Sequence, residues 1–139
     1  MSHRNRRMKV YNQDTLFAVA RLDAHAAIPR WATEFFAVTR TSDELSIVCP
    51  EPFVPPDVIA ERGFRMLMVD GPLDFALTGV LASIASPLAE AGVSLFVIST
   101  YDTDYVLVRN EHLADAVGAL RGAGWDVAVG NAQKIQDAV

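Results

Sequence analysis

Two short segments of the chain hold side chains suited to binding a small charged molecule. In residues 70–79, Asp74 precedes small and apolar residues that begin a helix. In residues 99–104, the hydroxyls of Ser99 and Thr100 stand beside the carboxylates of Asp102 and Asp104. Unpaired backbone N–H groups at a helix start suit a carboxylate, and aspartate side chains suit an ammonium group or a basic side chain. The two segments together are therefore the place in the chain where we expect a ligand to bind.

A purely structural interpretation of the same residues stays open. In this interpretation Asp74 caps the helix without binding a ligand, and Asp102 and Asp104 shape a hairpin turn without binding one. The two aspartates also resemble part of a metal site, but the remaining oxygen ligands and the loop glycine are missing, so we expect no metal.

Other reactive residue types give no catalytic pattern. The three histidines are scattered, without Glu or Cys at ligand spacing: His3, His25 and His112. Cys49 ends an apolar run, so we expect a small buried residue rather than a nucleophile. Because no base, nucleophile and oxyanion donor can be assembled, we expect no enzyme and no cofactor.

Composition limits the class of protein. With 139 residues, 51% of them apolar, the chain can bury a real core. No apolar run approaches the roughly 18 to 20 residues of a membrane span, so we expect no membrane partner. The single cysteine allows no internal disulfide and fits a reducing cytoplasm. The basic N-terminus lacks the apolar segment of a secretory signal.

Charge is distributed unevenly along the chain. The net charge is −5, but the first nine residues hold four basic groups, so the rest carries 8 basic against 17 acidic groups, or −9. An acidic body repels phosphodiesters, and we therefore expect no nucleic-acid partner. The basic residues of segment 1–13 predict a solvated, disordered tail.

Hydrophobic patterning predicts an alternation of strands and helices. Seven strands are expected, at residues 16–22, 35–40, 44–49, 64–70, 93–100, 105–109 and 125–129. Four helices are expected: a short one after Asp23, one from Pro56 to Glu61, a long one from Asp74 to Gly92, and one from Asn110 to Gly122 or Gly124. The strand at 93–100 is apolar on both faces, which is typical of a central strand.

An internal repeat divides the chain into two similar halves. At an offset of 60 residues, 36–39 falls on 96–99, and the next strand of each half also aligns. The repeat predicts an α+β fold of two tandem ferredoxin-like βαββαβ units, each with an antiparallel sheet covered by helices on one face. Seven strands are one fewer than two such units need, so one is missing, shared or exchanged. We expect these domains: a tail at 1–13, a first unit with a short first helix at 14–62, a second unit at 63–130, and a C-terminal tail at 131–139.

Three stretches of the chain carry a family likeness: residues 44–49 (ELSIVC), 71–79 (GPLDFALTG) and 98–105 (ISTYDTDY). Over residues 14–129 the chain resembles the ACT domain family of small-molecule-binding regulatory modules, and in particular small bacterial proteins built from two such domains. The same module is similar to the repeats of cytosolic arginine sensors and to the regulatory tail of aspartate kinases. The resemblance implies an allosteric sensor that binds an amino acid at the interface between ACT units, usually as a homodimer.

The likeness and the residue chemistry together define the candidate site. It comprises Leu73, Asp74, Phe75, Leu77, Thr78, Gly79, Ser99, Thr100, Tyr101, Asp102, Thr103 and Asp104. Because no catalytic domain is attached, a separate effector protein would receive the signal. The alternative is a ligand-free dimerisation or protein-interaction module. Acidic residues in the site favour a cationic amino acid.

Overall fold

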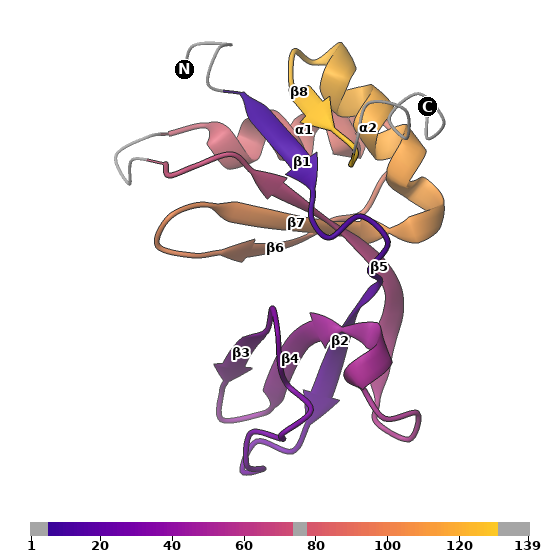
Figure 1. Ribbon diagram of the computed structural model, residues 1–139. Coiled ribbons are helices and arrows are strands. Elements are labelled where there is room, and N and C mark those ends of the chain that lie inside the picture. The colour runs from indigo at the N-terminus through magenta and orange to yellow at the C-terminus, as the bar shows by residue number, and fades with distance from the viewer. Residues whose placement is uncertain (1–5, 74–77, 131–139) are drawn as a thin grey trace. The chain divides into compact units, whose positions relative to one another are not determined.

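The computed structural model describes residues 6–73 and 78–130 (Figure 1). The chain is α+β and divides into two compact units. We call residues 14–64 the N-terminal unit, and residues 1–13 together with 65–139 the C-terminal unit. Strand β5 (Ala60–Val69) belongs to the first unit up to Phe64 and to the second from Arg65.

The N-terminal unit is a sheet of four strands. It contains β2 (Phe17–Leu22), β3 (Ala37–Arg40), β4 (Leu45–Pro50) and the first part of β5, in the order β3-β4-β2-β5. All neighbours are antiparallel. The predicted strands at 16–22, 35–40 and 44–49 are confirmed, although β3 begins two residues later than expected.

Residues 14–64, all of which the structure describes, contain no α-helix. The predicted helices after Asp23 and at 56–61 are therefore wrong. The Asp23 carboxylate instead accepts a hydrogen bond from the backbone N–H of His25 (2.9 Å), which forms a turn. Only a few residues separate this turn from Pro29, too few to nucleate a stable helix. The second segment, 56–61, contains a turn and the start of β5 at Ala60, and the nearest helical element is a single 3₁₀ turn before it, η2 (Glu51–Phe53).

Loops take the place of helices over the apolar face of this sheet. Alternate residues of β2 and β4 form a buried cluster, against which loop residues such as Ala26, Trp31 and Val58 pack. Arginine side chains fasten these loops. The Arg40 guanidinium donates to the carbonyl oxygens of Ala24 and Ala26, and that of Arg62 donates to the carbonyl of Pro55 (2.8 Å).

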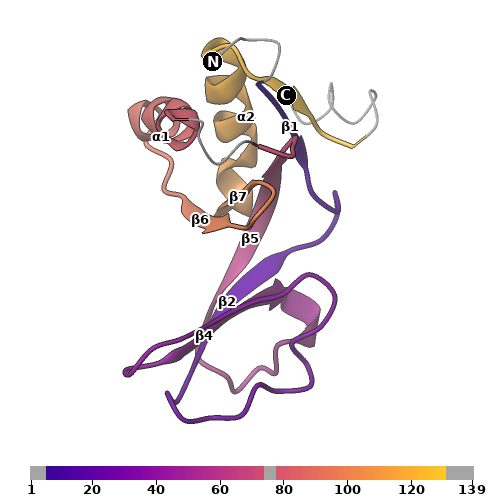
Figure 2. The same ribbon diagram turned by 90° about the vertical axis from the view of Figure 1, so that its left-hand side faces the viewer.

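Among its described residues, the C-terminal unit has two α-helices and five strands, one of which is the second part of β5. It contains α1 (Val80–Glu90), β6 (Phe96–Ser99), β7 (Asp104–Arg109), a 3₁₀ turn η3 (Asn110–His112), α2 (Leu113–Gly122), β8 (Asp126–Ala128) and β1 (Arg7–Val10). The strand order is β6-β7-β5-β1-β8. Figure 2 shows both helices on one side of this sheet. Among the described residues, neither helix has the length and apolarity that crossing a membrane requires.

Strand β1 corrects the prediction of a disordered tail at 1–13. Residues 7–10 are ordered between β5 and β8, antiparallel to the first and parallel to the second. Met8 and Val10 are buried, whereas the alternating residues Arg7 and Lys9 are exposed. This alternation is a strand signal that the high positive charge of the segment obscured. Strand β1 brings the number of strands in the described part of the chain to eight, and it is the one that the prediction of seven strands missed.

Strand β6 corrects a second prediction. The doubly apolar segment 93–100 was expected to form a central strand, but in the part of the chain that the structure describes β6 pairs only with β7. It is an edge strand, and Phe96 remains 39% exposed.

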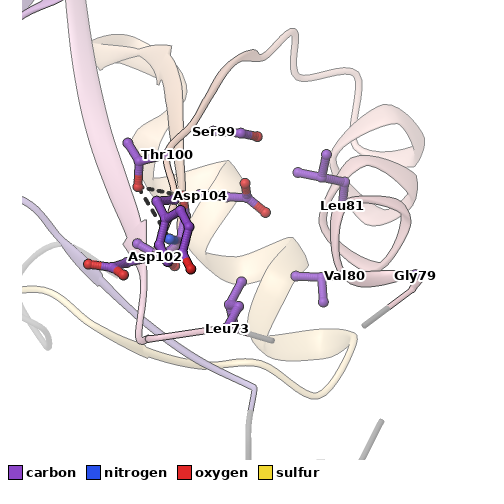
Figure 3. A pocket seen from close by; sticks show the side chains of 10 residues that line it. Leu73, Gly79, Val80, Leu81, Ser99, Thr100, Asp102 and Asp104 are labelled. Atoms are coloured by element: carbon purple, nitrogen blue, oxygen red, sulfur yellow. Dashed lines mark hydrogen bonds between the residues drawn. The ribbon is translucent and has the colours of Figure 1, made fainter. Parts of the chain in front are cut away.

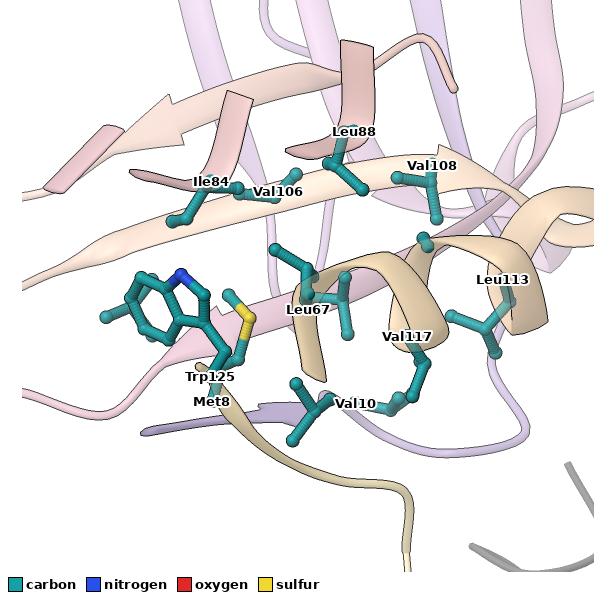
Figure 4. Packing of buried hydrophobic residues seen from close by; sticks show 14 of the residues in the cluster. Met8, Val10, Leu67, Ile84, Leu88, Val106, Val108, Leu113, Val117 and Trp125 are labelled. Carbon is teal, nitrogen blue, oxygen red and sulfur yellow. The ribbon is translucent and has the colours of Figure 1, made fainter. Parts of the chain in front are cut away.

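The core of the C-terminal unit fixes the position of α1. Ile84 and Leu88 of this helix point toward Val106 and Val108 of β7 (Figure 4). Beside them, the indole N–H of Trp125 donates to the carbonyl oxygen of Ser83 (3.1 Å). Because all four aliphatic side chains are fully buried, the start of α1 is held at a definite place relative to β7.

Candidate ligand-binding pocket

A pocket of about 300 Å³ lies between the start of α1 and the loop that joins β6 to β7 (Figure 3). This volume is at the lower end of the range for small-molecule sites. The pocket is lined by Leu73, Gly79, Val80, Leu81, Ser99, Thr100, Tyr101, Asp102, Thr103 and Asp104. All ten residues belong to the C-terminal unit.

The first turn of α1 supplies backbone donors to the pocket. Gly79 is the N-cap residue, with a φ of 81°, and no side chain caps the helix. The first helical bond runs from the N–H of Ser83 to the carbonyl of Gly79 (2.9 Å). The N–H groups that precede Ser83 in this turn therefore lack helical partners and lie at the positive end of the helix dipole.

Strand register places Asp104 and Ser99 on the same side of the sheet as α1. Ser99 pairs with Asp104, and Val97 pairs with Val106, which belongs to the core beneath the helix. Because side chains alternate along a strand, Ser99 and Asp104 share the face of Val97 and Val106. Figure 3 shows the Asp104 carboxylate directed into the space in front of Leu81, whereas that of Asp102 points away.

The Asp104 carboxylate is partly buried and available for a ligand. Within residues 6–73 and 78–130, no group donates a hydrogen bond to it and no cation pairs with it. The described lining residues include two carboxylates and no basic side chain. The pocket therefore offers backbone donors on one wall and a negative charge opposite.

The loop at 100–103 is fastened to the end of β5. The buried hydroxyl of Thr103 donates to the carbonyl of Val69 (2.8 Å), and the backbone N–H of Leu73 donates to the carbonyl of Asp102 (2.6 Å). A Cβ atom on Gly71 would lie 3.0 Å from the Cβ of Thr103, so glycine permits this close approach. These contacts hold the pocket wall in place before any ligand binds.

The structure brings together eight of the predicted site residues: Leu73, Gly79, Ser99, Thr100, Tyr101, Asp102, Thr103 and Asp104. Thr78 is described but does not line the pocket, and Asp74, Phe75 and Leu77 lie outside the described residues. Sequence reasoning missed Val80 and Leu81, because it began the helix at Asp74 and placed these two inside it. The glycine at position 79, just before an apolar period, was the available signal for the true start.

Two residues outside the pocket lining, Cys49 and Tyr105, have raised pKa values. Burial raises the pKa of the Cys49 thiol to about 11, so the thiol is protonated at neutral pH and is a poor nucleophile. Burial, and then the nearby Tyr11 and Asp102, raise the pKa of Tyr105. Within the described residues, no group of three His, Cys, Asp or Glu side chains could hold a metal ion.

Comparison with family models agrees with this division of the chain. A model described as an ACT domain matches residues 59–122, a range that contains every lining residue of the pocket. A second model, of an N-terminal domain, matches residues 15–57.

Known proteins resemble the chain in sequence and in structure. A solved structure from Agrobacterium tumefaciens is 40% identical, covers 87% of this chain and 90% of its own, and superposes with a TM-score of 0.81. The cytosolic arginine sensor for mTORC1 subunit 1 from Bos taurus is 32% identical over 98 residues, which are 63% of this chain. The chain spans only 30% of that sensor's length.

A third similarity concerns the fold alone. Aspartate kinase from Clostridium acetobutylicum, described as an allosteric enzyme, superposes with a TM-score of 0.61 at 12% identity, over 79% of this chain and 33% of the kinase. Its likeness and that of aspartate kinase regulatory subunits agree with ferredoxin-like units. By its family-model match, the part of the chain at residues 59–122, which holds every residue lining the pocket, belongs to the ACT domain family.

Proposed function

We propose that the protein is a non-enzymatic sensor that binds an amino acid in the pocket between α1 and the β6–β7 loop. The observation that carries the proposal is the uncapped N-terminus of α1 on one wall and the unpaired Asp104 carboxylate on another. A free amino acid has one carboxylate and one ammonium group a few ångströms apart. Its carboxylate would accept hydrogen bonds from the N–H groups of the first turn, and its cationic group would bind Asp104.

Arginine is the first ligand to test. The lining residues carry two carboxylates without a basic side chain, which favours a ligand of net positive charge. The relative from Bos taurus is named as an arginine sensor, and its similarity covers more than half of this chain. Leu73, Val80 and Leu81 would contact the aliphatic part of such a ligand.

We propose that binding is read out by a change in how ACT units associate. All lining residues come from one unit, so the second ACT unit expected at a ligand interface would belong to another copy of the chain. A ligand shifts such an equilibrium only by as much as it prefers one arrangement. A separate effector protein, in the cytoplasm, would detect the change.

A thermal-shift screen against the twenty amino acids tests the proposal. A ligand present at 100 times its dissociation constant adds about 2.7 kcal/mol to the free energy of unfolding, which is several degrees for a chain of this size. We expect arginine or another cationic amino acid to raise the melting temperature. A flat screen, on protein shown to carry no bound metabolite, would contradict the proposal and favour the ligand-free dimerisation module.

A further inference from the structure

A proline in the interior of α1 leaves one carbonyl group without a helical partner. In an α-helix the carbonyl oxygen of one residue accepts a hydrogen bond from the N–H four residues later. For Ser83 that later residue is Pro87, which has no N–H and whose ring crowds the same carbonyl. A backbone carbonyl that faces a protein core must be paired. The carbonyl of Ser83 therefore needs a donor from outside α1.

The indole of Trp125 supplies this donor. Its N–H donates to the carbonyl oxygen of Ser83 at 3.1 Å, across 42 residues of sequence. The indole belongs to the buried cluster that also holds Ile84 and Leu88 of α1, and Trp125 is only 3% exposed (Figure 4). An indole N–H can only donate, and a buried polar group without a partner destabilises the fold. Pro87 and Trp125 are therefore complementary, because one frees an acceptor and the other pairs with it.

Ser83 connects this hydrogen bond to the pocket. Its backbone N–H donates to the carbonyl of Gly79 (2.9 Å), and its hydroxyl donates to the carbonyl of Val80 (2.6 Å). Both acceptor residues line the pocket (Figure 3). Trp125 does not line the pocket, but through Ser83 it holds the turn of α1 that does.

The position of the indole is itself fixed by backbone bonds on both sides. The N–H of Trp125 donates to the carbonyl of Leu120 near the end of α2 (3.0 Å), and the N–H of Asp126 donates to the carbonyl of Arg6 (2.9 Å). Asp126 begins β8, which pairs with β1. The indole is thus carried by α2 and the sheet, and it connects both of them to the start of α1.

We propose that Trp125 is a positioning residue for the ligand, because it holds the first turn of α1 where its N–H groups can receive the ligand carboxylate. The link to binding rests on the proposed function, whereas the pairing of Trp125 with Ser83 does not. Binding groups must be held within about 0.5 Å of the productive geometry. Without the indole, the carbonyl of Ser83 has no donor in the core, so the turn shifts toward water and its N–H groups lose their alignment.

A pair of substitutions in the full chain tests this role. Trp125→Phe removes the indole N–H, and Pro87→Ala gives α1 the N–H that Ser83 lacks. The smaller ring leaves the same gap with or without Pro87→Ala, so a difference between the two backgrounds isolates the hydrogen bond. By calorimetry, we expect Trp125→Phe to bind arginine about fivefold more weakly than the wild type. In the Pro87→Ala background the same change should alter the affinity by less than about twofold.

The other tryptophan of the chain provides the matched control. Trp31 packs against the core cluster of the N-terminal unit, and we expect Trp31→Phe to leave arginine affinity unchanged. An equal loss of affinity from Trp125→Phe in both backgrounds would overturn the proposal, because the smaller ring would then be the cause. Unchanged affinity in Trp125→Phe would also overturn it and would leave the proposed function standing.

Thermal unfolding of the same variants tests the hydrogen bond without any ligand. We expect Trp125→Phe to lower the melting temperature by several degrees more in the wild-type background than in the Pro87→Ala background. A Trp125→Phe protein that folds only when Pro87→Ala is also present would support the pairing, and equal losses in both backgrounds would overturn it. A wild type that binds no cationic amino acid would overturn the proposed function and the role of Trp125 in binding.

Discussion

The two units build similar strand patterns and differ in what covers the sheet. In the C-terminal unit, α1 and α2 pack on the sheet through a large cluster of fully buried side chains. In the N-terminal unit, loops fastened by Arg40 and Arg62 take the place of helices. The hairpins correspond closely, since β3 and β6, like β4 and β7, lie about 60 residues apart.

The comparison shows which part of the fold can create a site. Both hairpins carry acidic residues near the turn, Asp43 in one and Asp104 in the other. Only the C-terminal unit adds a helix whose first turn faces the hairpin, and the pocket lies there. We therefore attribute ligand binding to the helix start and hairpin acting together, rather than to the acidic hairpin alone.

The largest effect should come from removing the helix packing. Leu88→Ala deletes a fully buried side chain of α1, which typically costs about 2 to 5 kcal/mol. We expect hydrogen exchange to accelerate most in α1 and β7, with smaller changes in β2 and β4. Uniform acceleration in both units would show that they unfold together. It would contradict the view that the helix packing stabilises the C-terminal unit alone.

The next effect concerns the two acidic hairpins. Asp104→Asn removes the charge that faces the start of α1, and we expect arginine affinity to fall about 10- to 100-fold, the usual range for a hydrogen bond to a charged group. Asp43→Asn is the matched control, because it changes the equivalent hairpin where no helix faces it. Calorimetry measures both. Equal losses in the two variants would contradict the assignment of the site.

A smaller effect is expected from pH in the N-terminal unit. Burial raises the pKa of Cys49 from 9.0 to about 11, so the folded state favours the protonated thiol. The contribution of the protonated Cys49 thiol to the free energy of unfolding is complete below pH 9. It is lost as the pH rises from 9 toward 11. At pH 10 we expect a loss of about 1.4 kcal/mol in the free energy of unfolding, which Cys49→Ala should not show. Urea unfolding of both proteins at pH 8 and 10 measures the difference; identical losses would refute it.

The smallest effect should come from the loops of the N-terminal unit. Arg40→Met keeps the aliphatic stem but removes the bonds to Ala24 and Ala26, at a cost of about 1 kcal/mol. Arg30→Met, in the same loop, is the control. We expect faster proteolysis of residues 23–36 in the first variant alone. An unchanged cleavage rate would mean that apolar packing, and not Arg40, holds the loop.

Much of the fold was predictable from local patterns. Short apolar runs identified seven of the eight strands found in residues 6–73 and 78–130, and the 60-residue repeat identified the paired hairpins. The helices were harder. Asp23 and Pro56 are good helix-start residues, but the segments after them are too short to form helices without a packing surface. The motif at Asp74 suggested a helix start at a position outside the described residues, whereas α1 begins at Val80.

The pocket was predictable in part, for a physical reason. Ser99 ends β6, Asp102 lies in the turn and Asp104 begins β7, so local sequence is enough to bring these three residues close together. The contribution of Val80 and Leu81 depends on how α1 lies against β7, which packing determines over long separations in sequence. The edge position of β6 was missed for the same reason, because a doubly apolar pattern does not show whether a strand has one neighbouring strand or two.

One measurement tests the central claim most directly: backbone amide NMR of the isotope-labelled protein during titration with arginine. We expect saturable shifts at residues 79–81 and 99–104, and none at 41–44 in the equivalent hairpin of the N-terminal unit. A titration that shifts only amides outside 79–81 and 99–104, or shifts none with any cationic amino acid, would contradict an amino-acid site between α1 and the β6–β7 loop.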